Sequence, residues 1–461
     1  MKVAIIKPPE VHPYWYKKRP ALGISYLSSY LTKNKIANKI FDAYYFSWSS
    51  EETVKVVAKY KPDLIGISSM THEIIATHQL TSLLKEKMPE VPIIIGGCHI
   101  TALPVQTLKE FPNFTYGVYG EGEKTLLELV SYLKNNKRGR ISSIKGLVYR
   151  NKQGKIFLNK TRERLTSEEL DALPFPAFHF YYKKGRKSLA EKDDHYVMMT
   201  SRGCPYNCVF CMQVLGRQVR RRTPEGIVAE IEYAINHYGA HTIQFYDEIF
   251  LFNDEICYQT LDLIIQRNLH KKIQWFGLTR VNMVNKELIH KAKEAGCFRL
   301  EMGIESGSNK ILRRINKQIT VKQVEQAVNI IKDEKILTDV NYILGHPGET
   351  RKTLQKTVNL AIRLNTTTMA MGIMVPYPGT EVYKMVQEGR GGYRLLSKDW
   401  SAYDKYGGKA LEIKGLPLAE LERWQRKALL YFYLKNFRFW ELLKFVIEYR
   451  RVIISLLLPK H

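Results

Sequence analysis

A short strand pattern and a cysteine-rich loop follow each other in the stretch Tyr196-Val197-Met198-Met199-Thr200-Ser201-Arg202-Gly203-Cys204-Pro205-Tyr206-Asn207-Cys208-Val209-Phe210-Cys211. The apolar start of this stretch, as far as Thr200, is typical of a buried strand. Three cysteines then fall within eight residues, with the spacing Cys-x3-Cys-x2-Cys. Gly203 and Pro205 favour a loop over a continued strand. Thiolates held this close together can converge on one metal centre, so the sequence predicts a metal site at the carboxyl end of a strand.

The number of cysteines separates the kinds of metal centre that the loop can hold. A structural zinc site closes its tetrahedron with four ligands, and no fourth ligand is close in the sequence. A four-iron cluster held by three thiolates keeps an open position on one iron, as a cluster that binds a substrate requires. Two other interpretations remain: three buried cysteines without a metal, and zinc completed by a distant histidine.

Strand and helix patterns alternate after this loop, over residues 195–385. The predicted strands are Tyr196–Thr200, Thr242–Tyr246, Ile273–Leu278, Arg299–Gly303, Asp339–Leu344 and Ala370–Val375. The helices between them are Pro224–His237, Glu255–Arg267, Lys286–Ala295, Val321–Glu334 and Thr350–Leu364. Six such units predict a partial (β/α)6 barrel of the TIM type, with its chemistry at the carboxyl ends of the strands.

Residues 1–140 show the same alternation in a shorter form. The predicted strands are Lys2–Lys7, Lys39–Tyr44, Leu64–Ser68, Ile93–Gly97 and Tyr116–Tyr119. The helices between them are Leu22–Thr32, Glu51–Lys59, His72–Lys87, Pro104–Phe111 and Lys124–Lys134. Nearly continuous apolar strands indicate a parallel sheet covered on both faces, so we expect a doubly wound, flavodoxin-like (Rossmann-type) domain. Ligands of such domains bind beyond the carboxyl ends of the strands.

Two further segments complete the expected α/β architecture. Residues 141–194 form a connector, with a hairpin over Gly146–Asn159 and a stiff proline-rich strap at Leu173–Pro176. Residues 386–461 form a C-terminal extension, and Leu421–Lys460 is helical in pattern and rich in aromatic and basic residues. This extension either caps the barrel with its aromatic side chains or lies on an anionic membrane surface.

Composition and charge limit the classes that remain. The chain has 461 residues, 45% hydrophobic and 25% charged, which excludes a disordered chain or a fibre. Six irregularly spaced cysteines do not suggest a disulfide framework, and the apolar run Val452–Leu458 is far shorter than the ~20 residues that cross a bilayer. We therefore expect a cytoplasmic protein. The net charge of +26 suggests an anionic ligand or surface without choosing among them.

The cysteine loop after the first barrel strand resembles the signature of the radical S-adenosylmethionine (SAM) enzymes, and the preceding domain resembles their B12-binding subgroup. The resemblance covers residues 1–385. Further motifs that support it are Gly96–Pro104, Tyr119–Glu123, Leu173–Ala177, Met302–Ser308, Gly345–Thr350 and Pro376–Glu381. It implies that Cys204, Cys208 and Cys211 hold a [4Fe–4S] cluster whose fourth iron binds SAM, and that electron transfer from the cluster cleaves SAM to a 5′-deoxyadenosyl radical.

The resemblance also implies which residues contact the cofactors. Phe210 matches the aromatic residue beside the adenine of SAM. Tyr246, Asp247 and Glu248 end the second barrel strand, where the family binds the methionine amino group. Since acidic residues at a strand end often cap the next helix, that structural role stays open. Arg280 and the pair Glu305 and Ser306, after the third and fourth strands, would contact the methionine carboxylate and the ribose hydroxyls, or form a surface ion pair and a turn.

Cobalamin is expected at the strand ends of the first domain. The residues placed there by the resemblance are Ser68, Ser69, Thr71, Gly96, Gly97, Gly120 and Glu121. Glycines would allow the backbone to approach the corrin closely. The Asp-x-His-x-x-Gly motif, through which other cobalamin proteins offer histidine to cobalt, does not occur. If B12 binds, we therefore expect no histidine ligand to cobalt.

The function expected from the resemblance is methylation of an unactivated carbon of a small-molecule substrate, with an electron donor such as flavodoxin or ferredoxin. A cobalamin-dependent cyclase or rearrangement enzyme is the main alternative. A tRNA-modifying methylthiotransferase is disfavoured because its three further N-terminal cysteines are missing, and no nucleic-acid partner is expected. An iron–sulfur electron carrier is the non-enzymatic alternative.

Overall fold

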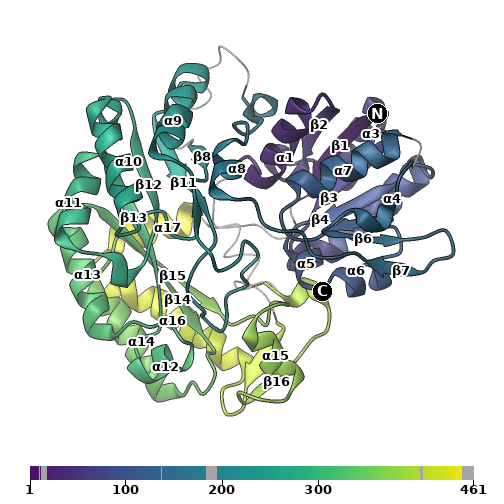
Figure 1. The fold of residues 1–461 in the computed structure, drawn as a ribbon. Coiled ribbons are helices and arrows are strands. Elements are labelled where there is room, and N and C mark those ends of the chain that lie inside the picture. Colours follow the sequence, from purple (N-terminus) through teal and green to yellow (C-terminus); the bar gives the residue numbers. More distant parts are fainter. Residues whose placement is uncertain (10, 12–17, 136–137, 183–194, 405–408, 449–461) are drawn as a thin grey trace. The chain divides into compact units, whose positions relative to one another are not determined.

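The computed structural model describes residues 1–9, 11, 18–135, 138–182, 195–404 and 409–448. These residues form two compact units, the first ending at residue 182 and the second starting at residue 195. Each unit contains its own sheet (Figure 1). The division of the chain into four segments remains a prediction, and its C-terminal part, residues 449–461, lies outside the described residues.

The first unit is built on a seven-stranded sheet with the strand order β2-β1-β3-β4-β5-β6-β7 (Figure 1). Neighbouring strands from β2 to β5 pair in parallel, whereas β6 and β7 are antiparallel. The strands are β1 Lys2–Lys7, β2 Ala37–Asp42, β3 Leu64–Ser68, β4 Ile93–Gly96, β5 Tyr116–Val118, β6 Leu147–Arg150 and β7 Ile156–Leu158. The expected doubly wound parallel arrangement is thereby confirmed. The hairpin expected in the connector instead extends this sheet, because β6 pairs with β5.

Helices cover both faces of this sheet. They are α1 Leu22–Lys33, α2 Ala43–Phe46, α3 Ser50–Tyr60, α4 Ile74–Lys87, α5 Cys98–Ala102, α6 Pro104–Glu110, α7 Glu123–Lys134 and α8 Ser167–Asp171. One predicted boundary is wrong: the strand expected over Lys39–Tyr44 ends at Asp42. The Asp42 side chain accepts a hydrogen bond from the Tyr45 amide and caps α2, so the chain turns into a helix two residues early.

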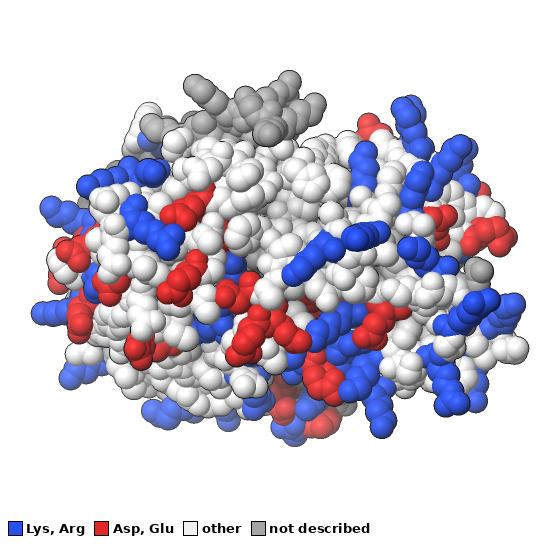
Figure 2. Space-filling view, turned by 45° about the horizontal axis from the view of Figure 1, so that its top comes forward, with Lys and Arg blue, Asp and Glu red and all other residues white. Residues whose placement is uncertain are grey.

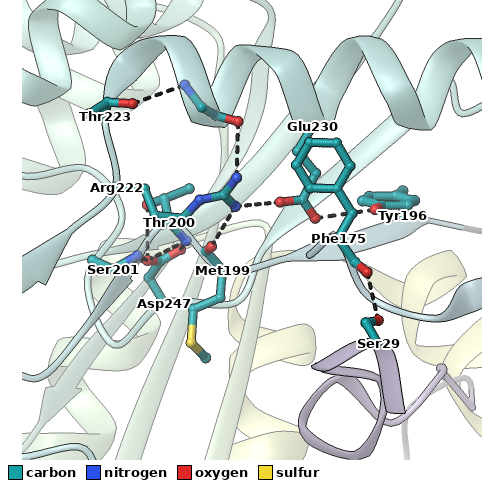
Figure 3. A network of polar contacts seen from close by, with 11 residues as sticks. Ser29, Phe175, Tyr196, Met199, Thr200, Ser201, Arg222, Thr223, Glu230 and Asp247 are labelled. Atoms are coloured by element: carbon teal, nitrogen blue, oxygen red, sulfur yellow. Dashed lines mark hydrogen bonds and ion pairs between the residues drawn. The ribbon is translucent and has the colours of Figure 1, made fainter. Parts of the chain in front are cut away.

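The proline-rich strap is held against α1 within the first unit. The Ser29 hydroxyl donates to the Phe175 carbonyl at 2.7 Å, and the Ala177 amide donates to the Ser25 carbonyl at 3.1 Å (Figure 3). Because proline cannot donate a backbone hydrogen bond, the neighbouring residues anchor this segment.

The second unit contains six parallel strands in the order β15-β14-β13-β12-β11-β8 (Figure 1). The strands are β8 Tyr196–Met198, β11 Thr242–Phe245, β12 Gln274–Thr279, β13 Cys297–Glu305, β14 Leu337–Leu344 and β15 Thr368–Ile373. Each overlaps the strand predicted for it. The sheet ends at β8 and β15 without a pairing between them among the described residues, so the expected partial barrel is confirmed.

Helices follow most of these strands. They are α9 Pro224–Tyr238, α10 Glu255–Gln266, α11 Lys286–Glu294, α12 Asn309–Arg314, α13 Val321–Asp333, α14 Arg351–Leu364 and α15 Glu381–Gln387. Beyond them lie α16 Leu418–Lys435, α17 Phe439–Glu448 and a small antiparallel pair, β16 Tyr393–Leu395 with β17 Leu411–Ile413. That pair was not predicted, since each strand has a charged residue at its centre and therefore shows no continuous apolar run.

Buried aromatic and charged groups pack around β8, β11 and β12 of the second unit. The Phe245 and Phe250 rings stack at 3.6 Å, and Trp275 meets both edge-on. On the neighbouring α9, the fully buried Glu230 pairs with Arg222 and accepts a hydrogen bond from the Tyr196 hydroxyl at 3.2 Å (Figure 3). The loops that follow these strands begin at the carboxyl ends of the strands.

Lys and Arg side chains are interspersed with Asp and Glu on the face drawn in Figure 2, and some of them form ion pairs. Pairs in the second unit include Arg363 with Glu325 at 2.6 Å and Arg267 with Glu232 at 3.0 Å. Among the described helices, none is both long and apolar enough to cross a membrane.

The loop after β14 contains a buried carboxyl group whose titration is measurable. Glu349 accepts hydrogen bonds from the Gly345 and His346 amides at 2.8 and 3.1 Å, yet burial raises its pKa from 4.5 to about 7. Between these two values the folded state holds more protons than the unfolded state. The contribution of Glu349 to the stability of the folded state is therefore fully present below pH 4.5 and is lost as the pH rises through about 7.

We predict that Glu349→Gln stabilises the protein relative to wild type at pH 8, by on the order of 3 kcal/mol, and gives little change at pH 4.5. Melting temperatures of both proteins between pH 4.5 and 8 test this. Burial lowers the pKa of His346 to about 4, so His346 changes the stability with pH in the opposite direction. Both proteins contain His346, so the difference between them does not include its effect. A difference that does not grow with pH would contradict the prediction.

Candidate active site

The cysteine loop is closed at its base by a short pair of strands. β9 (Ser201–Arg202) pairs antiparallel with β10 (Arg220–Arg221), so both ends of the loop are held together. Just above, the Cys204 amide donates to the Gly216 carbonyl at 3.0 Å. Arg220 and Arg222 are buried, and Arg221 pairs with Asp254 at 2.6 Å. These arginines therefore build the base of the loop.

Gly203 is the residue that allows this closure. Its φ is +102°, and a Cβ atom there would lie 2.2 Å from the Gln218 carbonyl oxygen. A side chain would thus meet both a strained backbone conformation and a backbone atom that cannot move aside.

We predict that Gly203→Ala lowers the iron and sulfide bound after anaerobic reconstitution by about tenfold or more, with a loss of stability above 1 kcal/mol. Iron and sulfide analysis and thermal melting test this. Gly239→Ala is the matched control, because Gly239 also has a positive φ but has no heavy atom within 4 Å of the added Cβ. Equal cluster content in the two variants would show that the close approach at Gly203 does not matter.

The three thiols share one site. Cys208 is buried, Cys204 is half-buried and Cys211 is exposed. Burial, together with repulsion from Cys208 and Cys204, raises the pKa of the Cys211 thiol to about 12. The three cysteines thus lie on one loop within electrostatic reach of one another. Their role as cluster ligands stays a prediction.

Two buried cations flank these thiols. Arg280 lies with Nη1 3.9 Å from the Cys208 sulfur and its guanidinium 3.6 Å from the centre of the Tyr206 ring. It also donates to the Lys317 carbonyl. The Lys317 ammonium pairs with Glu305 at 2.8 Å, and both side chains are buried. Arg280 was predicted to be in the site, whereas Lys317 was not, because it follows a short helix and no motif marks it.

Glu305 occupies a strained position at the end of β13. Its φ is +70°, which is rare for a residue other than glycine. Next to it, Ser306 is fully buried and its hydroxyl lies 3.3 Å from that of Thr357 on α14. Glu305 therefore holds the buried Lys317, while Ser306 holds the turn after the strand. Their predicted contacts with SAM stay predictions.

The carboxylates after β11 have two different roles. Asp247 is buried and accepts hydrogen bonds from the backbone amides and the hydroxyls of Thr200 and Ser201 (Figure 3). It therefore anchors the turn that leads into the cysteine loop. Burial raises the pKa of the neighbouring Glu248, whereas the backbone amides of Glu248 and Gly203 lower it. One oxygen of its carboxylate, Oε2, is buried without a protein partner. Tyr246 is exposed. Of the three predicted residues, Glu248 is the one that offers an acceptor to a ligand.

Phe210 lies between the loop and the later strands. Its ring is 5.8 Å from that of His346 and 5.9 Å from the Lys317 ammonium. The backbone on either side is held as well: the Val209 amide donates to the Ile315 carbonyl, and its carbonyl accepts from the Val382 amide. Its predicted contact with adenine stays a prediction.

The arrangement fits an iron–sulfur cluster better than a single ion. No group of three or more His, Cys, Asp or Glu side chains, within the part of the chain that the structure describes, is placed to hold one metal ion. A four-iron cube is wider than one ion, so its thiolates need not converge on a single point. This arrangement suits a cluster with a charged ligand on its open iron. The three thiols can bind irons, while the buried Glu248 oxygen and the nearby Arg280 can bind the charged groups of the ligand.

The carboxyl edge of the first sheet collects the residues predicted for cobalamin. The Ser69 amide donates to the Gly96 carbonyl at 3.0 Å, so the ends of β3 and β4 are tied together. Gly97 has a φ of +101°, and a Cβ there would lie 2.6 Å from the Ser69 carbonyl oxygen. Gly96 and Gly120 face open space, where a Cβ would meet no atom within 4 Å. Ser68 at the end of β3 is half-buried.

Other side chains predicted for cobalamin are engaged within the protein. Ser69 lies 2.9 Å from the Thr77 hydroxyl, and Thr71 lies 3.4 Å from the His99 ring. The Glu121 carboxylate accepts from the Leu165 amide at 2.7 Å. A flat ligand would therefore contact the open backbone at the glycines rather than these side chains, which already have partners within the protein.

A buried ion pair at this edge was not predicted. Lys7, at the end of β1, binds Glu73 at 2.5 Å, and the side chains are only 13% and 7% exposed. Glu73 also accepts from the Met70 amide at 2.9 Å, which fixes the loop after β3. The sequence separation of 66 residues hides this pairing from a local pattern.

Two protein-family models match the chain in the order expected. The model described as the B12 binding domain matches residues 17–130, and the model of the radical SAM superfamily matches residues 198–361. The chain belongs to the radical SAM superfamily, in the group whose members carry a B12-binding domain before the barrel. The family, enzyme class and cofactor set predicted from the sequence are confirmed by these matches.

Similar proteins have several activities. An uncharacterized methyltransferase of Pyrococcus horikoshii is 30% identical over 440 residues, which cover 94% of this chain and 93% of that protein. An anaerobic magnesium-protoporphyrin IX monomethyl ester cyclase of Rubrivivax gelatinosus is 26% identical over 79% of this chain and 66% of its own. The fold is similar to that of the radical SAM methyltransferase TsrM from Kitasatospora setae, with a TM-score of 0.72 and 17% identity over 92% of this chain and 84% of the other.

Proposed function

We propose that the protein is a cobalamin-dependent radical SAM methyltransferase that methylates an unactivated carbon of a small molecule. The carrying observation is the cysteine loop, closed by β9 and β10 after the first barrel strand, with the Arg280 guanidinium 3.9 Å from the Cys208 sulfur and a buried Glu248 oxygen without a protein partner. When bound, the cluster supplies the electron that cleaves SAM, and cobalamin supplies a carrier for the methyl group.

The residues of the barrel would bind and orient SAM. Glu248 has one buried carboxylate oxygen without a protein partner, which would accept a hydrogen bond from the methionine ammonium group. Arg280 and Lys317 place two positive charges beside the thiolates and would offset the negative charge of a cluster with four sulfides. Asp247 contributes indirectly by holding the turn before the loop.

The first unit would bind cobalamin on the open backbone at Gly96 and Gly120. The tie between Ser69 and Gly96 and the Lys7–Glu73 pair hold the loops around this edge. TsrM, which has the same fold, has been solved with cobalamin and a [4Fe–4S] cluster bound. That structure supports the assignment of the two ligands to the two units.

A small-molecule substrate and a protein electron donor complete the proposal. TsrM has also been solved with tryptophan as its substrate, which supports a small molecule here. Cys211 is exposed, so a small carrier such as flavodoxin or ferredoxin would have a short path to the cluster. We assign the reaction to the cytoplasm, where such reduced carriers occur.

Anaerobic reconstitution with iron, sulfide and hydroxocobalamin tests the function. With a reductant and SAM labelled in its methyl group, we expect label to leave SAM and S-adenosylhomocysteine to form. Protein reconstituted without cobalamin is the control and should form none. Label found only in SAM and methionine, with no S-adenosylhomocysteine under several reductants, would contradict the proposal.

A cyclase is the second candidate, and the similarity to the Rubrivivax cyclase supports it. The same experiment separates the two functions, because a cyclase would form 5′-deoxyadenosine without S-adenosylhomocysteine. An electron carrier would form neither product.

A further inference from the structure

The C-terminal helix α16 is fixed firmly to the second unit by one of its faces. Leu421, Ala428 and Phe432 are buried on that face. The Gln425 side chain donates to the Met371 carbonyl of β15 at 2.6 Å. After the helix, Arg438 donates to the Thr366 and Thr367 carbonyls at 2.8 Å. The opposite face of α16 is therefore held outward in a defined orientation.

The following helix α17 exposes apolar side chains along one face. Phe439, Trp440, Leu443, Val446 and Ile447 recur at the spacing of a single helix face and are 43–64% exposed. Before them, Phe437 is 82% exposed and its ring lies 6.3 Å from that of Phe439. Soluble monomers rarely expose so many large apolar side chains together, so this surface has a partner.

Basic residues line a shallow pocket at the other end of α16. The pocket has a volume of about 380 Å³ and is lined by Arg351, Glu420, Arg423, Trp424 and Lys427. Its one carboxylate, Glu420, is already bound by Arg351 at 2.7 Å through both oxygens. The positive charges of Arg423 and Lys427 therefore remain available to an anion.

The basic pocket and two exposed leucines lie on one side of α16. Arg423, Lys427, Leu430 and Leu434 follow one another at positions i, i+4, i+7 and i+11, which lie on the same side of a helix. Leu430 and Leu434 are 44% and 36% exposed. The exposed side of α16 thus changes from basic to apolar along the helix, and the exposed apolar side chains of Phe437 and α17 follow it in the chain. We call these exposed residues together the C-terminal face.

We propose that the C-terminal face docks on an anionic lipid bilayer, with a headgroup phosphate in the basic pocket. Aromatic and aliphatic side chains next to basic residues are what an interfacial helix presents to a membrane. α17 has ten residues, half of the ~20 needed to span a bilayer, so it would lie along the surface. A second copy of the chain would present the same positive pocket, whereas anionic lipid complements it.

Vesicle flotation with the full chain tests this proposal. We expect binding to vesicles of phosphatidylcholine with phosphatidylglycerol, little binding to phosphatidylcholine alone, and release at high salt. The variants Arg423→Glu with Lys427→Glu, and Phe437→Ser with Trp440→Ser, should each lower the bound fraction tenfold or more. All four side chains point to solvent or into the open pocket, so melting temperatures should stay close to wild type.

Matched controls come from the hairpin of the first unit. Lys152→Glu with Lys155→Glu, and Leu158→Ser, alter exposed basic and apolar side chains of the same kinds and should not change flotation. Equal binding to neutral and anionic vesicles, or unchanged flotation of the C-terminal variants, would overturn the proposal. So would a dimer of the wild type that the Phe437 and Trp440 changes dissociate without affecting flotation. None of these readouts depends on the cofactors.

Discussion

Replacement of Cys204, Cys208 or Cys211 by alanine, one at a time, is expected to abolish stable cluster binding and all cleavage of SAM. Each thiolate would hold one iron, and two remaining thiolates leave a second iron open to water and loss. The loop offers no substitute among the described residues, since the remaining cysteines, Cys98, Cys257 and Cys297, are in other elements. Iron and sulfide analysis, the optical spectrum of the cluster and 5′-deoxyadenosine formation test this.

Cys257→Ala on α10 is the matched control, because Cys257 is buried but lies outside the loop. It should keep full cluster content and turnover at a modest cost in stability. The prediction fails if any loop variant retains both the cluster and product formation. It also fails if the control loses as much iron as the loop variants.

Replacement of Arg222 by methionine is expected to cost about 3–5 kcal/mol of stability, because it leaves the carboxylate of Glu230 buried without its cation. Glu230 is fully buried, and burial raises its pKa whereas Arg222 lowers it. Without Arg222 the pKa of Glu230 should rise further. The loss should therefore shrink as the pH falls and Glu230 becomes protonated. Chemical denaturation at pH 5 and pH 8 measures both effects.

Two comparisons distinguish the cost of leaving a buried carboxylate unpaired from the cost of removing an arginine in general. Arg222→Met combined with Glu230→Met should recover most of the stability, since no buried charge remains. Arg363→Met breaks the exposed pair with Glu325, whose side chains are 57% and 37% exposed, and should cost only about 0–1 kcal/mol. Equal losses in the two single variants would contradict the role assigned to burial.

The parallel sheets were predictable because their strands are buried on both sides. A run such as Leu64–Ser68 or Tyr196–Met198 is apolar throughout, and turn residues mark its ends. Side-chain capping was harder to predict. The Asp42 side chain ends β2 because it accepts a hydrogen bond from the Tyr45 amide and so begins α2. The strands β16 and β17 were missed because each is short and has a charged residue at its centre, which breaks the apolar run.

The candidate site was predictable where its residues are adjacent in sequence. The three cysteines, Gly203 and Glu248 lie in or next to motifs at strand ends. Lys317 and the Lys7–Glu73 pair become neighbours only through the tertiary fold, so local patterns do not reveal them. The sequence also could not distinguish the two carboxylates after β11, since only their hydrogen bonds separate the anchoring Asp247 from Glu248.

The strand pair that closes the base of the cysteine loop has a consequence for cofactor assembly. Because β9 and β10 are joined by protein hydrogen bonds alone, the entropy of ordering the loop ends is lost when the polypeptide folds rather than when metal arrives. The protein without its cluster should therefore already hold the ends of the cysteine loop in place when the cluster is inserted. After oxygen has destroyed one inorganic core, the same molecule should accept another without refolding.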